Sequence, residues 1–151
     1  MYKPPIRKTP PKKILLIEEH RMGRLARKTV LDEMGYRTSA AATSQEAFEL
    51  VAEGGYDLIV TDYRASGVYG VDLIQKLRKK LPHAPIVIVS GFVDSLGLTA
   101  QNTGADFVIQ KGSSEVGLMV RAVRGLLRKA QTSRRKPAGS QPGPTRRRKS
   151  A

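Results

Sequence analysis

The chain has 151 residues, no cysteine and a formal net charge of +14. This length fits a single domain, and 40% hydrophobic residues are enough to form a core. The lack of cysteine excludes disulfides and thiolate metal sites. No apolar run approaches the about 20 residues of a membrane helix, and the N-terminus lacks the apolar core of a signal peptide. We therefore expect a soluble, cytoplasmic protein.

The excess positive charge lies at the two ends of the sequence. Residues 1–13 carry five Lys or Arg, residues 130–151 carry seven, and neither segment contains an acid. Both ends are rich in Pro, Gly, Ser and basic residues and poor in large apolar ones, which predicts disorder. We therefore expect a disordered basic arm at 1–12, a folded domain at 13–130 and a disordered basic tail at 131–151.

Within the folded domain, short apolar runs alternate with amphipathic segments. In chain order, the sequence predicts a strand at 13–19, a helix at 21–35, a weak strand at 36–41, a helix from Thr43 to the glycines at 54–55, a strand at 57–63, a helix at 71–81, a strand at 85–91, a weak helix at 94–104, a strand at 106–111 and a helix at 113–130. Thr43 and Glu46 have the spacing of a capping box, in which Thr43 caps the helix and Glu46 reaches back. The alternation predicts an α/β fold, a doubly wound sheet of five parallel strands with five helices.

Polar side chains lie at the carboxyl ends of four of the five predicted strands. They are Glu18 and Glu19 in the first strand, Asp62 in the third, Ser90 in the fourth and Lys111 in the fifth. The carboxyl ends of parallel strands meet at one edge of a sheet, where open α/β sheets bind ligands. Clustered carboxylates favour a hard divalent cation such as Mg²⁺, and a carboxylate can attack phosphorus. The set therefore suits phosphoryl transfer onto a carboxylate.

These residues, in this order, resemble the receiver domain of bacterial response regulators, the CheY-like family, over residues 13–130. Gly70 and the "GAD" at 104–106 add to the resemblance. It implies a flavodoxin-like fold and a signalling module that is not an enzyme. The roles that it implies are phosphoacceptor for Asp62, phosphate contact for Ser90 and Lys111, Mg²⁺ binding for Glu18, Glu19 and Asp62, and tuning of phosphoryl lifetime for Arg64.

The resemblance also implies partners. A sensor histidine kinase, a phosphotransfer protein or a small phosphodonor would phosphorylate Asp62. A change in the face formed by about residues 93–128 would then select a downstream protein. The basic tails suit non-specific contact with nucleic-acid phosphates, docking on an acidic protein or membrane surface, or solubility alone.

Three positions depart from the family pattern and leave a second interpretation open. Glu19 stands where the family usually has Asp, Val108 occupies the position of an aromatic switch, and Gly112 replaces a proline. These departures favour a pseudo-receiver, a constitutive protein-interaction module without phosphorylation. The presence of Asp62, Ser90 and Lys111 together favours a stand-alone, phosphorylated receiver. Structural alternatives exist for each residue, such as a turn aspartate or a surface lysine.

Overall fold

The computed structural model describes residue 2 and residues 9–135. Most of the predicted N-terminal arm (1–12) and C-terminal tail (131–151) lies outside these residues. The domain boundaries and the role of the tails therefore stay predictions. In the part of the chain that is described, no helix is long and apolar enough to cross a membrane.

Five parallel strands form one sheet in the order β2-β1-β3-β4-β5. Their bounds are Lys13–Ile17 (β1), Arg37–Ala41 (β2), Leu58–Thr61 (β3), Ile86–Ser90 (β4) and Phe107–Gln110 (β5). All five predicted strands are therefore present. Because β2 lies on one side of β1 and β3 on the other, the direction of winding reverses at β1. In this topology the crevice at the carboxyl ends of β1 and β3 is the usual position of a ligand.

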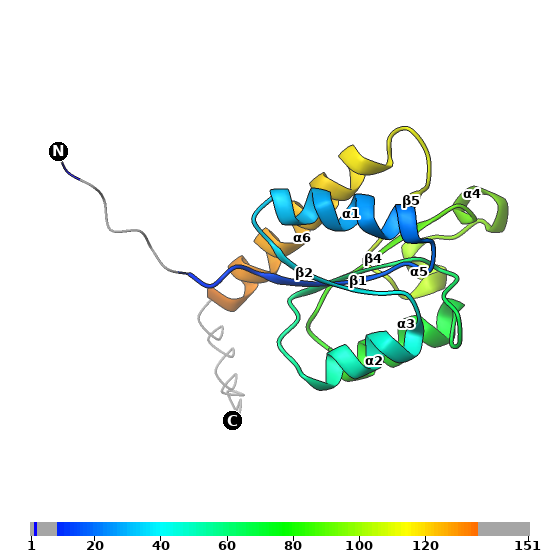
Figure 1. The fold of residues 1–151 in the computed structure, drawn as a ribbon, viewed down its shortest axis with the longest axis horizontal. Coiled ribbons are helices and arrows are strands. Elements are labelled where there is room, and N and C mark those ends of the chain that lie inside the picture. Colours follow the sequence, from blue (N-terminus) through cyan, green and yellow to red (C-terminus); the bar gives the residue numbers. More distant parts are fainter. Residues whose placement is uncertain (1, 3–8, 136–151) are drawn as a thin grey trace, which may run out of the picture.

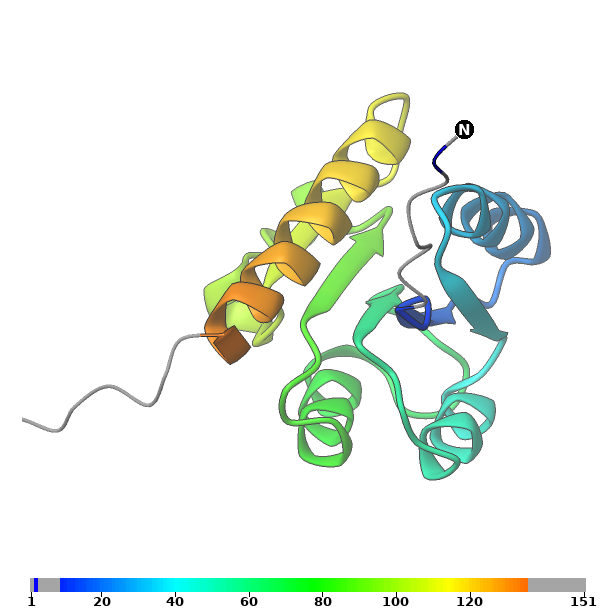
Figure 2. The ribbon, with the colours of Figure 1, turned by 90° about the vertical axis from the view of Figure 1, so that its left-hand side faces the viewer.

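Four longer helices cover the two faces of the sheet. They are α1 (Arg21–Glu33), α2 (Ser44–Ala52), α3 (Gly70–Lys80) and α6 (Glu115–Arg135). Figure 1 shows α1 and α6 on one face and α2 and α3 on the other, and the turned view in Figure 2 shows the same layers. This is the doubly wound α/β fold that the sequence predicts.

The segment predicted as one weak helix at 94–104 forms two short ones instead. They are α4 (Val93–Leu96) and α5 (Ala100–Thr103), so the described residues contain six helices rather than five. α4 ends at Gly97, whose φ of 60° lies in the left-handed region that favours glycine. Thr99 then caps α5, because its side chain accepts a hydrogen bond from the backbone N–H three residues later. The helix therefore stops at Gly97 and a new helix starts after Thr99, which divides the segment in two.

Two other helix ends differ from the sequence prediction. α6 continues five residues beyond the predicted end at 130, to Arg135. No Gly or Pro occurs between residue 130 and Pro137, so the sequence contains no signal that stops the helix earlier. At α2, Thr43 caps the helix as predicted, but Glu46 reaches back to the backbone N–H of Ala42 instead of Thr43.

Two apolar cores lie on opposite faces of the sheet. Side chains alternate along each strand, so Ile59 faces the core under α2 and α3 whereas Val60 faces the core under α1 and α6. Leu15 and Ile17 of β1 lie in the first core, and Leu16 lies in the second. Strands that are buried on both faces are apolar at consecutive positions. Such strands hold the polar residues at their ends in fixed places.

Candidate functional site

An open cleft of about 600 Å³ lies at the carboxyl edge of the sheet. It is lined by Glu18, Glu19, His20, Arg21, Met22, Asp62, Arg64 and Lys111. The ends of β1 and β3 are joined there, because the backbone N–H of Asp62 donates to the carbonyl of Ile17 over 2.9 Å. The structure thus brings five of the predicted site residues, the two glutamates, the aspartate, the arginine and the lysine, to one cleft.

Lys111 connects two of the carboxylates in the cleft. Its Nζ donates to Asp62 Oδ2 over 2.7 Å and to Glu18 Oε1 over 2.9 Å. The Glu18 side chain is only 3% exposed, whereas that of Lys111 is 27% exposed. A single ammonium group therefore bridges two acids, one of them inside the protein.

The three groups shift one another's pKa values. Burial, followed by the neighbouring carboxyl of Asp62, raises the pKa of Glu18. Burial acts in the same direction on Asp62, but hydrogen bonds from Glu18 and Lys111 outweigh it and lower the pKa of Asp62. Burial alone would lower the pKa of Lys111, yet its bonds to Asp62 and Glu18 raise it. Asp62 is therefore the more acidic of the two carboxyls. Its lowered pKa favours the ionised carboxylate, which is the form that a nucleophile needs.

Ser90 lies beside the cleft, inside the protein. It is the last residue of β4 and fully buried, and its Oγ accepts a hydrogen bond of 3.2 Å from the backbone N–H of Phe92. Its carbonyl accepts a bond of 2.9 Å from the backbone N–H of Lys111. Ser90 does not occur among the described residues that line the cleft. In the bond to Phe92 its hydroxyl is the acceptor, so the O–H can still donate to a bound group.

Glu19 faces a different partner from the other two acids. Its Oε1 accepts a hydrogen bond of 2.5 Å from Ser66 Oγ, in the loop between β3 and α3. Among the described residues, no group of three or more acidic, His or Cys side chains is arranged to hold a metal ion. The carboxylate oxygens of Glu18, Glu19 and Asp62 are nonetheless the hard ligands that Mg²⁺ takes. These three side chains therefore have the chemistry that Mg²⁺ requires. That they form a metal site stays a prediction.

Arg64 contacts an aromatic ring. Its guanidinium carbon lies 4.0 Å from the centroid of the Phe92 ring, a distance at which a cation is attracted to the π face. Its backbone N–H donates to Asp62 Oδ1 over 3.3 Å. Arg64 thus joins the loop after β3 to the start of α4, next to Ser90.

The buried face of α1 is not simply its apolar face. Met22 and Leu25 are apolar, yet they are 65% and 57% exposed. Arg27 is only 7% exposed and contacts Glu18, after β1, and Glu115, in α6. Sequence analysis missed this residue because the apolar pattern of a helix predicts that apolar side chains, and not an arginine, are buried.

Arg27 connects the acid cleft to α6. Its Nη1 lies 3.6 Å from Glu18 Oε1, and its Nη2 lies 2.9 Å from Glu115 Oε2. A Cβ atom at Gly23 would lie 2.7 Å from Arg27 Nη1 and 3.2 Å from Glu18 Oε1. A glycine four residues before an arginine was therefore the one sequence signal that could have pointed to this cluster.

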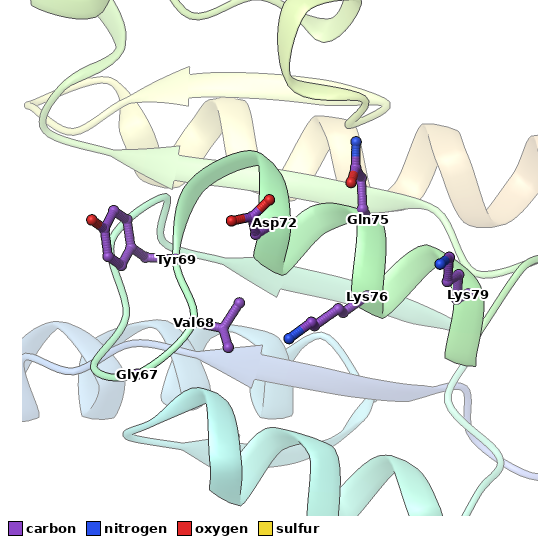
Figure 3. Close-up of a pocket in the computed structure, with 7 residues that line it drawn as sticks. All are labelled: Gly67, Val68, Tyr69, Asp72, Gln75, Lys76 and Lys79. Atoms are coloured by element: carbon purple, nitrogen blue, oxygen red, sulfur yellow. The ribbon is translucent and has the colours of Figure 1, made fainter.

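A separate cavity of about 490 Å³ lies beside α3. Figure 3 shows its lining side chains, which come from α3 and from the loop before it: Gly67, Val68, Tyr69, Asp72, Gln75, Lys76 and Lys79. None of them is a predicted site residue. The acid cleft is therefore the candidate functional site.

Comparison with known proteins matches residues 14–123 to the response regulator receiver domain. The chain is 30% identical over 81 residues to the chemotaxis protein CheY of Pseudomonas aeruginosa, a match that covers 52% of this chain and 65% of CheY. It is 30% identical over 112 residues to the transcriptional regulatory protein AfsQ1 of Streptomyces coelicolor, which covers 74% of this chain and 45% of AfsQ1. The chain spans 13% of the aerobic respiration control sensor protein ArcB of Escherichia coli, at 28% identity. It therefore covers less than two thirds of the length of each of these relatives.

Solved structures with the same fold include a two-component response regulator from Clostridium difficile. It has a TM-score of 0.70 and 28% identity, and the match covers 78% of this chain and 97% of that one. The response regulator TrrA of Thermotoga maritima, solved in complex with Mg²⁺ and BeF, has a TM-score of 0.67 and 25% identity, over 76% of this chain and 98% of that one. Because the family match covers most of its length, residues 14–123, the chain belongs to the response regulator receiver domain family.

Proposed function

We propose that this chain is a stand-alone receiver that accepts a phosphoryl group on Asp62 and signals by phosphorylation-dependent protein binding. The observation that carries the proposal is the position of Asp62, which ends a core strand in an open cleft with Lys111 at 2.7 Å. The lowered pKa of Asp62 supports its role as nucleophile. A sensor histidine kinase or a phosphotransfer protein in the cytoplasm would be the donor.

In the proposed reaction an oxygen of Asp62 attacks the phosphorus atom of the donor. The new O–P bond gives an acyl phosphate, the bond between donor and phosphorus breaks, and the donor group leaves with that electron pair. Lys111 keeps its ammonium beside the new phosphoryl oxygens. The Ser90 hydroxyl, which accepts a hydrogen bond from the N–H of Phe92, donates its own hydrogen to a phosphoryl oxygen. The chain is thus an acceptor of the group rather than an enzyme.

Glu18, Glu19 and Asp62 are the residues that would hold Mg²⁺. Bound there, the ion would neutralise charge on the phosphoryl oxygens. The complex of the Thermotoga maritima relative with Mg²⁺ and BeF supports such a site in this family. For Glu19 to take part, its carboxylate must leave Ser66.

The proposed output surface is the face formed by about residues 93–128. An apolar groove of about 400 Å³ lies on it, lined by Phe107, Leu118, Arg121, Ala122, Gly125, Leu126 and Lys129. Phe107 is 42% exposed in this groove. Phe92 donates its backbone N–H to the Ser90 hydroxyl and is the N-cap residue of α4. A change at Ser90 on phosphorylation would therefore be passed to this face through α4.

A pseudo-receiver is the second candidate, and one observation favours it. The carboxylates of the site are already engaged by internal partners, Lys111 for Glu18 and Asp62 and Ser66 for Glu19. A site whose charges are satisfied in this way can serve as a fixed structural element of a constitutive binding module.

Phosphorylation by acetyl phosphate separates the two candidates. We expect the wild-type protein with Mg²⁺ to gain the mass of one phosphoryl group, and Asp62→Asn to gain none. Asp57→Asn is a matched control, because Asp57 lies at the opposite end of β3 and its Oδ2 accepts a hydrogen bond from the backbone of Lys13. It should gain the group as the wild type does. A wild type that stays unmodified at every Mg²⁺ concentration would support the pseudo-receiver.

A further inference from the structure

Arg27 is a buried cation whose hydrogen bonds are incomplete. Its side chain is 9% exposed, and its Nε and Nη1 have no hydrogen-bond partner among the described residues. A buried charge is costly unless other charges or hydrogen bonds compensate it. The compensation for Arg27 therefore comes mainly from the carboxylates of Glu18 and Glu115.

The surroundings of Arg27 leave room for these contacts. The absence of a side chain at Gly23 provides the space, because a Cβ atom there would collide with Arg27 Nη1. The Glu18 carboxylate is thereby contacted from two sides, by Arg27 at 3.6 Å and by Lys111 at 2.9 Å. Glu18, one of the predicted metal ligands, is therefore already paired with two cations of the protein itself.

A divalent ion bound by Glu18 would share that carboxylate with Arg27. Lys111 has an exposed side and can move towards solvent, but Arg27 is enclosed and bound to Glu115. A fixed positive charge near a binding site for cations weakens their binding, and the repulsion is large where water is excluded. Glu115 opposes this effect, because it neutralises part of the charge of Arg27.

We propose that Arg27 is a positioning residue that acts through Glu18, as an internal cation that weakens the binding of divalent cations to the acid cleft. Glu115 reduces this weakening, because its carboxylate neutralises part of the charge of Arg27. The proposal rests on the magnesium site of the proposed function. It predicts opposite results for the loss of Arg27 and the loss of the Glu115 charge.

Binding of Mn²⁺, measured from the electron paramagnetic resonance signal of the free ion, tests this proposal without a phosphodonor. We expect Arg27→Met, which has a similar length and no charge, to bind Mn²⁺ about tenfold more tightly than the wild type. We expect Glu115→Gln to bind it more weakly, since it leaves the charge of Arg27 uncompensated. Lys28→Met is the matched control, because it removes one charge from the next position of α1, in an exposed pair with Asp32. It should change the affinity less than twofold.

Circular dichroism first establishes that each variant is folded. A merely structural role of the Arg27–Glu115 pair would shift Mn²⁺ affinity in the same direction in both variants, and that result would overturn the proposal. Equal affinity of Arg27→Met and wild type, or no binding by either, would also overturn it. Tighter binding by Arg27→Met together with no phosphorylation of Asp62 would support the proposal and count against the proposed function alone.

Discussion

Lys111 is the residue on which the charge balance of the cleft depends. It contacts Asp62 and Glu18 within 2.9 Å, and both contacts raise its own pKa. Its charge favours folding at every pH below its unfolded pKa, and this stabilisation is lost as the pH rises through the folded value. For Asp62, whose folded pKa is lowered, the stabilisation is present above the unfolded pKa and is lost as the pH falls through the folded value.

Replacement of Lys111 by Met should therefore destabilise the protein in a pH-dependent way. At pH 7 the variant leaves two adjacent carboxylates without a shared cation, and we expect a loss of about 1–3 kcal/mol in the free energy of unfolding. Near pH 4 Glu18, whose pKa is raised above its ordinary value of 4.5, takes up a proton and the repulsion falls, so the loss should shrink. Urea unfolding at both pH values measures it. Lys28→Met, in an exposed pair, should cost about 0.5 kcal/mol or less at either pH, and an equal loss for Lys111→Met at the two values would contradict this account.

At the scale of elements, strands were easier to predict than short helices. A run such as Ile86–Ser90 is buried on both faces and needs apolar residues at successive positions, which leaves a clear signal in the sequence. The four-residue helices α4 and α5 have no apolar period of useful length. Their bounds depend on the backbone conformation of Gly97 and on the cap at Thr99, which compete with the helical pattern of the whole segment.

The left-handed conformation of Gly97 gives a prediction with a paired control. Ala at this position would need a φ of 60°, and we expect Gly97→Ala to cost about 1 kcal/mol, although nothing lies within 4 Å of the added Cβ. Gly125 lies inside α6, and its Cβ would also meet nothing within 4 Å. We expect Gly125→Ala to stabilise the protein by about 0.5–1 kcal/mol. Thermal unfolding measures both, and the same sign for the two variants would contradict the explanation.

The cap of α2 gives a second prediction at this scale. Thr43 Oγ1 accepts a hydrogen bond of 3.1 Å from the backbone N–H of Glu46, which otherwise has no partner within the helix. We expect Thr43→Ala to lower the free energy of unfolding by about 1 kcal/mol. Thr43→Ser keeps the oxygen and should retain most of the stability. Denaturant titration of the three proteins decides whether the hydroxyl or the methyl group of Thr43 matters.

At the scale of the whole molecule, the sequence predicted the sheet and the edge of it at which these polar residues meet. Apolar runs and the rule for parallel strands were sufficient to place Asp62, Glu18 and Lys111 together. The cluster around Arg27 was not predictable in this way, because it joins α1 to α6 over 88 positions of the sequence. The turn of Glu19 towards Ser66 is likewise a contact across 47 positions.

The net charge of +14 predicts a property of the full chain. We expect weak, non-specific binding to random duplex DNA that falls steeply with salt, because phosphate contacts release counterions. Replacement of Arg146, Arg147, Arg148 and Lys149 by Gln should weaken the binding and flatten its dependence on salt. Fluorescence anisotropy at several salt concentrations measures both quantities. If the wild type shows no salt-dependent binding, the basic ends have another role.

The position of Lys111 also bears on synthesis and folding. The lysine follows the last strand of the sheet, 49 positions after Asp62 and 93 after Glu18. A nascent polypeptide that has not yet reached β5 has both acids but lacks their shared ammonium. The cleft is therefore completed only when the edge strand β5 docks. Asp62 would then become able to accept a phosphoryl group only after the whole sheet has folded.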